Sequence, residues 1–485
     1  MDVLLLRPAP RNERFGLGPF FRTEPLGLEY VAAALEARGH RAKVVDLRFG
    51  ESVERALARY RPGMVGVACL HTLEIDDSLD VARRVRRASP DVFLMLGGHS
   101  AAAFPGPLKS PDVNAIAVGD GERVAADVAE ALARGRSLRE VPGLLVNTGG
   151  DGFVATPDAE PVGLDEVPLP ARHAVVFSYR HYACLQYRPT WLVETARGCP
   201  FRCSFCSVWP LYQRSYRLRS IDAVCRDFAS VGPHVFVADD LFWHRADRSR
   251  ELAGELRRRA VRKEWVLVQS RTDLVASQPQ LLEAWRPFAN KIDIFFGLEA
   301  ATDRNLDGLA KDTTVASTVE AIKVAREYGY GVTGNFVIDP EWDEEDFERL
   351  WAFVDEHRLH RAGYTILTPL PGTPYYETVR ERIRATEWAQ FDMSHLLWEP
   401  KVGAQRFFEL YCETWRRSVL NLRGSKRWWQ WIGEVKPQHA LFLMRALLRT
   451  QRMMDPQYYL SEHRLAPAGA PLTGETPVPH TIAAS

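Results

Sequence analysis

The chain has 485 residues, too many for one ordinary hydrophobic core, so its length predicts two or three domains. Its 62 basic residues balance its 62 acidic residues, which gives no electrostatic reason to expect nucleic acid as a partner. Seven cysteines exclude a disulfide framework. Because there is neither a signal-peptide pattern nor an apolar run of about 18 residues, we expect a cytoplasmic protein.

Residues 1–145 alternate between short apolar runs and amphipathic stretches. Strands are predicted at residues 2–8, 41–47, 64–70, 92–98 and 114–120, and helices at residues 27–40, 52–60, 75–88 and 123–135. The first of these helices should stop at Gly39. Strands that alternate with helices of this length predict a doubly wound, Rossmann-like parallel sheet.

Small and polar residues follow the strands of this predicted sheet, at residues 8–19, 71–74, 97–101 and 119–122. Ligands of doubly wound sheets bind outside the carboxyl ends of the strands. Together these segments would let a large flat cofactor approach the backbone, although each of them alone is also consistent with an ordinary tight turn.

The rest of the chain divides into four parts. Residues 146–188 are proline-rich and predict a connector. Residues 189–380 contain six further strand–helix units, which predict a partial (β/α)6 barrel of the TIM type. Residues 381–464 are helical by period, including the stretch "DMSHLLW". Residues 465–485 are rich in proline and small residues, and we expect them to be disordered.

Three cysteines crowd the loop after the first barrel strand, in the segment "ETARGCPFRCSFCS" at residues 194–207. Cys199, Cys203 and Cys206 have the spacing to converge on one metal centre. A structural zinc ion needs four ligands, and the nearby histidines do not have zinc-ligand spacing. A cubane iron–sulfur cluster on three thiolates would keep one iron open. Zinc and three unconnected buried thiols remain the alternatives.

The stretch "RGCPFRCSFC" resembles the signature loop of the radical S-adenosylmethionine superfamily. The resemblance implies a 4Fe–4S cluster on Cys199, Cys203 and Cys206, whose open iron chelates S-adenosylmethionine. Reductive cleavage of that cofactor then gives a 5′-deoxyadenosyl radical that attacks a C–H bond inside the barrel.

The same resemblance implies contacts to S-adenosylmethionine at the ends of four other barrel strands. "FVADDLF" stands where the family has a Gly-Gly-Glu-like edge, so that match is positional. "FFGLEAATDRNL" resembles the fourth-strand motif of the family. The residues assigned in this way are Asp239, Asp240, Arg271, Glu299 and Asn335. An alternative for Glu299 is a carboxylate neutralised by Lys311 or Arg304.

The N-terminal region resembles the cobalamin-binding domain of the class B radical methylases. "EPLGLEY", "LGGHSAAAFP" and "AVGDGE" match the patterns of that family. The residues assigned to cobalamin are His71, Thr72, Gly97, Gly98, His99, Ser100, Gly119, Gly121 and Glu122. The Asp-x-His-x-x-Gly motif that supplies a histidine to cobalt is absent, so we expect no cobalt ligand from the protein, and His71 to pack beside the corrin.

These resemblances imply a methyltransferase that methylates an unactivated carbon through methylcobalamin and a substrate radical. The C-terminal region resembles the hopanoid C-3 methylase branch, which acts on a bacterial lipid. Its aromatic residues could line an apolar cavity or pack a helical cap, and they are Trp398, Phe407, Phe408, Trp428, Trp429 and Trp431. Lys426 and Arg427 could contact the inner face of a membrane. Asp392 and His395 could reach the active site, or Asp392 could cap a helix.

The implied partners are a hopanoid-like lipid substrate and an external electron donor such as flavodoxin or ferredoxin. Three alternatives stay open. They are an oxidative cyclase of porphyrins, a C-methylase of another natural product, and a cobalamin-binding sensor without catalytic activity.

Overall fold

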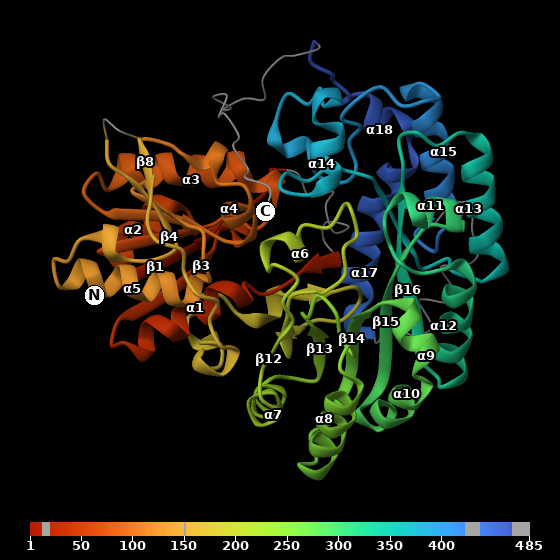
Figure 1. Cartoon of the computed structure of the whole chain (residues 1–485), viewed down its shortest axis with the longest axis horizontal. Helices are drawn as coiled ribbons and strands as arrows, with labels where there is room; N and C mark the ends of the chain where they lie inside the picture. The colour runs from red at the N-terminus through yellow and green to blue at the C-terminus, as the bar shows by residue number, and fades with distance from the viewer. Residues whose placement is uncertain (12–19, 150–151, 422–436, 468–485) are drawn as a thin grey trace.

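The computed structural model describes residues 1–11, 20–149, 152–421 and 437–467. Two α/β lobes lie side by side, and helices from the C-terminal part of the chain cover the second lobe (Figure 1).

The N-terminal lobe is built on a seven-stranded sheet of order β3-β1-β4-β5-β6-β7-β8. Its first five strands are parallel, as the alternating pattern predicted. The elements are β1 (Asp2–Arg7), α1 (Leu26–Ala37), β3 (Arg41–Asp46), α2 (Val53–Tyr60), β4 (Met64–Ala68), α3 (Ile75–Ala88), β5 (Phe93–Gly97), α4 (His99–Ala103), β6 (Ala115–Ala117) and α5 (Gly121–Ala133). Buried side chains of α1 and α5 pack on one face of the sheet, and those of α2 and α3 pack on the other.

The strand order of the parallel part reverses between β1 and β4. In doubly wound sheets a ligand binds at the carboxyl ends of the strands beside such a reversal. His71 lies three residues after the end of β4, and Gly98 directly follows β5. The fold therefore places two of the segments predicted for cobalamin at this edge.

The sheet continues beyond the parallel strands. β7 (Leu144–Asn147) pairs antiparallel with β6, and β8 (Phe153–Ala155) pairs antiparallel with β7. We expected residues 146–188 to be a connector, but their first part belongs to the sheet. β7 and β8 extend the edge of the sheet beyond β6.

The second lobe is an open sheet of six parallel strands in chain order, β10-β13-β14-β15-β16-β17, as expected for a partial barrel. Its strands are β10 (Trp191–Val193), β13 (His234–Val237), β14 (Lys263–Ser270), β15 (Ala289–Glu299), β16 (Gly331–Ile338) and β17 (Gly363–Ile366). Its helices are α6 (Val208–Leu211), α7 (Ile221–Ser230), α8 (Ala246–Arg258), α9 (Thr272–Ser277), α10 (Pro279–Trp285), α11 (Asp303–Gly308), α12 (Val315–Glu327), α13 (Glu344–Glu356) and α14 (Pro374–Val379). The short β11 (Ala196–Arg197) and β12 (Arg217–Leu218) pair antiparallel beside the cysteine loop.

A segment that precedes α1 in the chain belongs to the core of the second lobe. Phe20 is completely buried in the cluster that contains the outer face of the barrel strands. β2 (Phe21–Arg22) pairs with β9 (Ala183–Cys184), and Phe21 packs beside Trp265 inside the barrel. The chain therefore enters the barrel before it completes the N-terminal lobe.

The C-terminal region contributes α15 (Ala404–Arg416), α17 (Pro437–Thr450) and α18 (Pro456–Leu460). Phe407, Phe408 and Trp398 are buried in the hydrophobic cores, so these three rings pack the structure together. Lys426, Arg427, Trp428, Trp429 and Trp431 lie outside the described residues.

The stretch "DMSHLLW" is not helical, contrary to its predicted period. Asp392 Oδ1 accepts hydrogen bonds from the backbone N–H groups of Ser394 and His395 and from the His395 ring. The polar side chain therefore closes a local turn, an alternative that Asp offers the backbone in competition with a helix, and the expected helix cap is wrong.

Within the described ranges, no helix is long and apolar enough to cross a membrane.

Candidate functional site

The cysteine loop follows β10 and is held by hydrogen bonds from outside it. Asp240 accepts a hydrogen bond from the N–H of Gly198 at 2.9 Å. The N–H of Ser204 donates to the carbonyl of Leu309, and the indole of Trp209 donates to the carbonyl of Cys203 at 2.9 Å. The loop that carries the three thiols is therefore anchored to strands β13 and β15 and their following segments.

The three thiols lie in a partly enclosed, cationic environment. Cys203 is buried, while Cys199 and Cys206 are partly exposed. Burial raises the pKa of Cys206 to about 12 and also raises that of Cys203, against the opposing influence of Lys311 and Arg271. Arg271 Nη1 lies 4.0 Å from the sulfur of Cys203. Thiols that ionise only with a metal, beside fixed cations, suit a thiolate-bound cluster of net negative charge.

The number of donors separates the cluster from a structural zinc ion. The loop supplies three thiols, and a structural zinc ion needs four ligands. In a cubane three thiolates can bind three irons and leave the fourth iron open. Three donors therefore suit the cluster better than a structural zinc ion.

Arg271 and Glu299 lie next to the cysteine loop, as their positions at strand ends predicted. Arg271 stacks on the ring of Phe201 and donates to the carbonyls of Lys311 and Asp312. Glu299 is buried, has a left-handed backbone (φ 59°), and forms an ion pair with Lys311 at 2.8 Å. The alternative of neutralisation by Lys311 is therefore present in the structure, and a contact of Glu299 with S-adenosylmethionine stays a prediction.

The other residues assigned to S-adenosylmethionine differ in how far their side chains are engaged. Asp239 is completely buried, and its carboxylate accepts hydrogen bonds from the backbone and hydroxyl of Thr195 and from the N–H of Ala196. Its side chain holds β11 in place, so any contact from this segment would come from its backbone or from Asp240. Asn335 donates to the hydroxyl of Thr365 at 2.7 Å.

A small cavity lies between the two lobes and contains the predicted cobalamin residues His71, Thr72, His99 and Ser100 in its wall. Ser207, which follows the last cysteine of the loop, lines the same cavity. His99 Nε2 lies 2.9 Å from the Ser207 hydroxyl. The edge of the N-terminal sheet and the cysteine loop thus share one space.

Both histidines in this wall are expected to be neutral at physiological pH. Burial, with a smaller contribution from His71, lowers the pKa of His99 to about 4, and burial lowers that of His71. The His71 side chain accepts a hydrogen bond from the backbone of Glu74. These contacts orient both rings within the protein, which suits packing against a flat ligand.

Two of the four glycines assigned to cobalamin are also required by internal packing. A Cβ on Gly98 would lie 2.7 Å from the carbonyl oxygen of Cys69, and its φ of 115° also favours glycine. A Cβ on Gly119 would lie 3.0 Å from the Cβ of Ala159. Gly97 and Gly121 have only contacts of ordinary length, with Ala117 and Val31.

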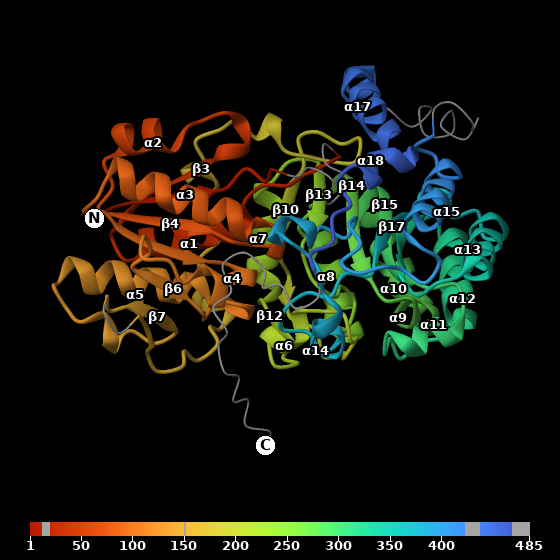
Figure 2. The same ribbon diagram turned by 90° about the horizontal axis from the view of Figure 1, so that it is seen from above.

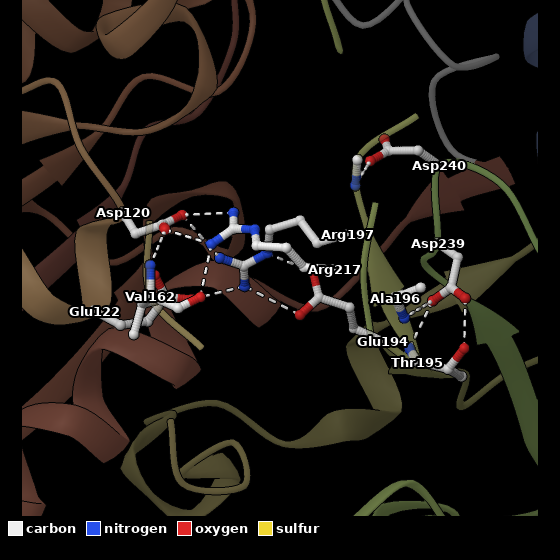
Figure 3. Close-up of polar contacts among 11 residues, drawn as sticks. Asp120, Glu122, Val162, Glu194, Thr195, Ala196, Arg197, Arg217, Asp239 and Asp240 are labelled. Carbon is white, nitrogen blue, oxygen red and sulfur yellow. Dashed lines mark hydrogen bonds and ion pairs between the residues drawn. The ribbon is translucent and has the colours of Figure 1, made fainter. Parts of the chain in front are cut away.

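Glu122 has a partner that the sequence did not predict. Its carboxylate accepts a hydrogen bond from Arg197 at 2.7 Å, and Arg197 also contacts Asp120 and Glu194 (Figure 3). Arg217 binds the same Asp120 at 2.6 Å. Arg197 lies two residues before Cys199, so this network connects the start of α5 directly to the cysteine loop.

We name these five residues the cluster joint: Asp120, Glu122, Glu194, Arg197 and Arg217. Their side chains are at most 16% exposed. Although burial alone would raise it, the guanidinium groups of Arg217 and Arg197 hold the pKa of Asp120 below its usual range. Well-paired buried charges of this kind fix geometry, because breaking one pair leaves its partner uncompensated.

Comparisons with known families agree with this arrangement. Residues 20–129 match the B12 binding domain, and residues 193–354 match the radical SAM superfamily. The second range contains all three cysteines of the loop, and the first contains every residue assigned to cobalamin. The chain therefore combines a B12 binding domain with a radical SAM domain, the pairing expected for a cobalamin-dependent radical S-adenosylmethionine methyltransferase.

Relatives of this methyltransferase cover much of its length. It is 28% identical to the hopanoid C-3 methylase of Methylococcus capsulatus over 484 residues, which span 98% of this chain and 91% of that protein. It is 25% identical to the anaerobic magnesium-protoporphyrin IX monomethyl ester cyclase of Rubrivivax gelatinosus, over 82% of this chain and 74% of that one.

Two solved structures share the fold of this methyltransferase. The methyltransferase TsrM of Kitasatospora setae, with cobalamin and a [4Fe–4S] cluster bound, superposes with a TM-score of 0.64 at 21% identity over 79% of each chain. The radical enzyme OxsB, with aqua-cobalamin and S-adenosylmethionine bound, gives 0.70 at 16% identity over 93% of this chain and 71% of that one.

The cofactors of this enzyme are a 4Fe–4S cluster, S-adenosylmethionine and cobalamin. When bound, they supply one-electron cleavage of a sulfonium and a transferable methyl group. The protein's own residues present three thiols that would hold the cluster, cations beside them, a cavity wall with two histidines, and the cluster joint between the two lobes.

Proposed function

We propose that this enzyme transfers a methyl group to an unactivated carbon of a hopanoid lipid, at C-3. The observation that carries the proposal is the likeness to the hopanoid C-3 methylase, which runs through 98% of this chain. That likeness therefore includes the C-terminal region, which lies outside both matched family models. The likeness to the porphyrin cyclase covers 82% of this chain.

The wall of the cavity supports an apolar substrate. Besides the two histidines, Leu370, Pro371, Phe391 and Met393 line it. The Met393 backbone is left-handed (φ 62°), and its carbonyl accepts a hydrogen bond from Ile366 of β17. A rigid polycyclic hydrocarbon requires such an apolar wall and few polar contacts.

We assign the site residues as follows. Cys199, Cys203 and Cys206 hold the cluster. Arg271, Glu299, Asn335, Asp240 and the backbone at Asp239 face S-adenosylmethionine. His71, Thr72, His99 and Ser100 face cobalamin. Gly97, Gly98, Gly119, Gly121 and Glu122 are also assigned to the cobalamin side of the site, where Glu122 is in addition paired with Arg197.

The first test establishes the cofactors and the product together. The protein is purified without oxygen from cells supplied with iron and cobalamin, and iron, sulfide and cobalt are measured per chain. A hopanoid, S-adenosylmethionine and a reduced flavodoxin or ferredoxin are then added, and the lipid is analysed by mass spectrometry.

A hopanoid that gains one methyl group at C-3 supports the proposal. A porphyrin ester that is cyclised without gaining a methyl group, under the same conditions, would replace it with the cyclase function. Loaded cofactors without turnover of S-adenosylmethionine on any of these substrates would favour the cobalamin-binding sensor.

A lipid substrate places the enzyme near a membrane surface, and we propose peripheral contact of a cytoplasmic protein. The residues first considered for this contact lie between positions 422 and 436, outside the described part of the chain.

A further inference from the structure

Helix α17 presents large apolar side chains to solvent. Leu441 and Leu448 are 64% and 59% exposed, and Met444 is 39% exposed. In the described part of the chain only one other large hydrophobic side chain, Val154, reaches comparable exposure. Three of four such residues therefore lie on one helix of 14 residues.

The three exposed residues form a single stripe. Positions 441, 444 and 448 have the i, i+3, i+7 spacing of one helix face. The opposite face packs into the core through Leu443, Ala446 and Leu447. The helix is thus apolar on two sides, and among the described residues only one of these sides packs into the core.

Basic side chains flank this stripe. Arg445 and Arg449 are exposed on the next face of α17, and they line a hollow of about 570 Å³ together with Arg22 and Arg188. Arg188 lies over the ring of Phe442, which is also in the hollow. Among the described residues, the lining of the hollow contains four arginines and no carboxylate.

We propose that this face, defined by Leu441, Met444 and Leu448 with Arg22, Arg188, Arg445 and Arg449, docks on the surface of an anionic phospholipid bilayer. An apolar stripe beside a row of arginines inserts side chains between lipid headgroups while the cations bind their phosphates. The proposal deepens the lipid-directed function proposed above, but it needs neither a cofactor nor the correct substrate to be tested.

Two other occupants fit the face less well. A symmetric second copy would bring the arginines of both chains against each other, with like charges at close range. An acidic electron-donor protein must reach the cysteine loop, but α17 projects from one side of the barrel while α6, which follows that loop, lies on the opposite side (Figure 2). A bilayer complements both the charge and the apolar stripe.

The arrangement also leaves the cavity between the lobes away from the docked face. Ser207 of the cavity wall directly precedes α6, and α14 follows the wall residues Leu370 and Pro371, on the side away from α17 (Figure 2). Docking through α17 would therefore hold the enzyme at the membrane without covering the cavity.

The experiment is co-sedimentation of the full-length protein with vesicles of phosphatidylcholine alone and of phosphatidylcholine mixed with phosphatidylglycerol. We expect binding to the mixed vesicles only, and weaker binding as salt is raised. Leu441→Glu combined with Leu448→Glu should abolish it. Arg445→Gln combined with Arg449→Gln should weaken it by about fivefold for each arginine.

Matched controls separate this face from general surface effects. Val154→Glu adds the same charge at the other exposed hydrophobic position, and Arg257→Gln with Arg262→Gln removes two exposed arginines from the barrel. Both should bind as the wild type does. Because every substituted side chain on α17 is exposed, circular dichroism should show unchanged folding.

Three results would overturn the proposal. The wild-type protein could fail to bind mixed vesicles, or the Leu441→Glu, Leu448→Glu variant could bind as well as the wild type. The third is a dimer in sedimentation equilibrium that this variant breaks, without vesicle binding, which would assign the face to a second copy. None of these results bears on which carbon is methylated, so the substrate proposal is decided separately.

Discussion

The two lobes meet at two buried charge clusters that differ in balance. In the cluster joint, Arg197 and Arg217 face three carboxylates, and each cation makes at least two charge-assisted hydrogen bonds. The distal joint consists of Glu24 before α1, Glu29 on α1, Arg172 in the connector and Asp227 on α7. It also joins the two lobes, but with a single cation.

The distal joint has three carboxylates and only one arginine to neutralise them. Arg172 binds Asp227 at 2.6 Å but lies 3.7 and 3.9 Å from Glu24 and Glu29. One oxygen on each of these three carboxylates is buried without a hydrogen-bond partner among the described residues. Burial, with the neighbouring carboxylate, raises the pKa of Glu29 to about 7 and raises that of Glu24.

One interface between the lobes thus combines a joint whose carboxylates stay ionised with a joint whose carboxylates have raised pKa values. The joint beside the cysteine loop keeps its charges paired, so its geometry should not depend on pH near neutrality. In the distal joint burial raises the pKa of Glu24 and Glu29, so its contribution to stability should change with pH.

The largest effect is expected from Cys203→Ala, which removes a cluster ligand and leaves both joints intact. Iron should fall from about four per chain to nearly none, and S-adenosylmethionine cleavage should stop. Cobalt content and the unfolding transition should change little. Metal analysis and the yield of 5′-deoxyadenosine check this, and a variant that retains iron and cleavage would remove the radical mechanism.

Arg197→Met should come next, because it leaves Glu122 and Glu194 without their cation, while Asp120 keeps Arg217. Loss of one partner of a buried pair destabilises by about 3–5 kcal/mol. Besides a lower unfolding midpoint, we expect 5′-deoxyadenosine to form without methylated product, since the lobes lose their register.

Arg197→Lys is the matched control for this change. Lysine keeps the charge but lacks the planar guanidinium that reaches several carboxylates. Arg197→Lys should therefore restore the unfolding midpoint more than it restores the yield of methylated product per 5′-deoxyadenosine. If both variants lost stability and kept the wild-type ratio of 5′-deoxyadenosine to methylated product, the cluster joint would be structural only.

Glu29→Gln tests the distal joint through pH. The folded-state pKa of about 7 lies above the ordinary value of 4.5, so the folded state binds more protons in this window. Wild-type stability should therefore be highest below about pH 4.5 for this group and fall as pH rises to about 7. In the Glu29→Gln variant the free energy of unfolding should depend less on pH between these values. At pH 8 the variant should be more stable than the wild type, by up to about 3 kcal/mol. Urea unfolding at pH 5.5 and 8 measures this, and parallel curves for the two proteins would contradict it.

Arg123→Ala should have the smallest effect. Arg123 pairs with Glu166 close to the cluster joint, but Glu166 is 66% exposed. Exposed pairs contribute about 0–1 kcal/mol. Unfolding in urea should show a change within that range, and a loss as large as that of Arg197→Met would erase the distinction between buried and exposed pairs at this interface.

The features that the sequence predicted are those encoded locally. Apolar runs of strand length alternating with helical periods located the parallel strands of both sheets, and the spacing of Cys199, Cys203 and Cys206 located the loop. The turn at Asp392 shows the limit of periodicity, because a polar side chain that bonds its own backbone overrides a helical pattern.

What the sequence did not reveal depends on contacts between distant residues. Arg197 meets Asp120 and Glu122 across 77 and 75 positions of chain, so no spacing rule connects them. Gly98 and Gly119 were assigned to a ligand because glycine lets backbones approach. The structure shows that a protein group also approaches each of them, Cys69 in one case and Ala159 in the other.

Phe20 has a consequence for how the two lobes can be separated. Since this ring completes the barrel core before the chain returns to form α1, no single cut divides the protein into two whole domains. A fragment that begins at the connector would lack part of its own interior, and a fragment that ends there would carry that part exposed. Residues 20–22 thus tie the start of the N-terminal lobe to the barrel, which restricts hinge motion between the lobes. Exchange of the N-terminal lobe between relatives should succeed only if residues 20–22 stay with the barrel that they fill.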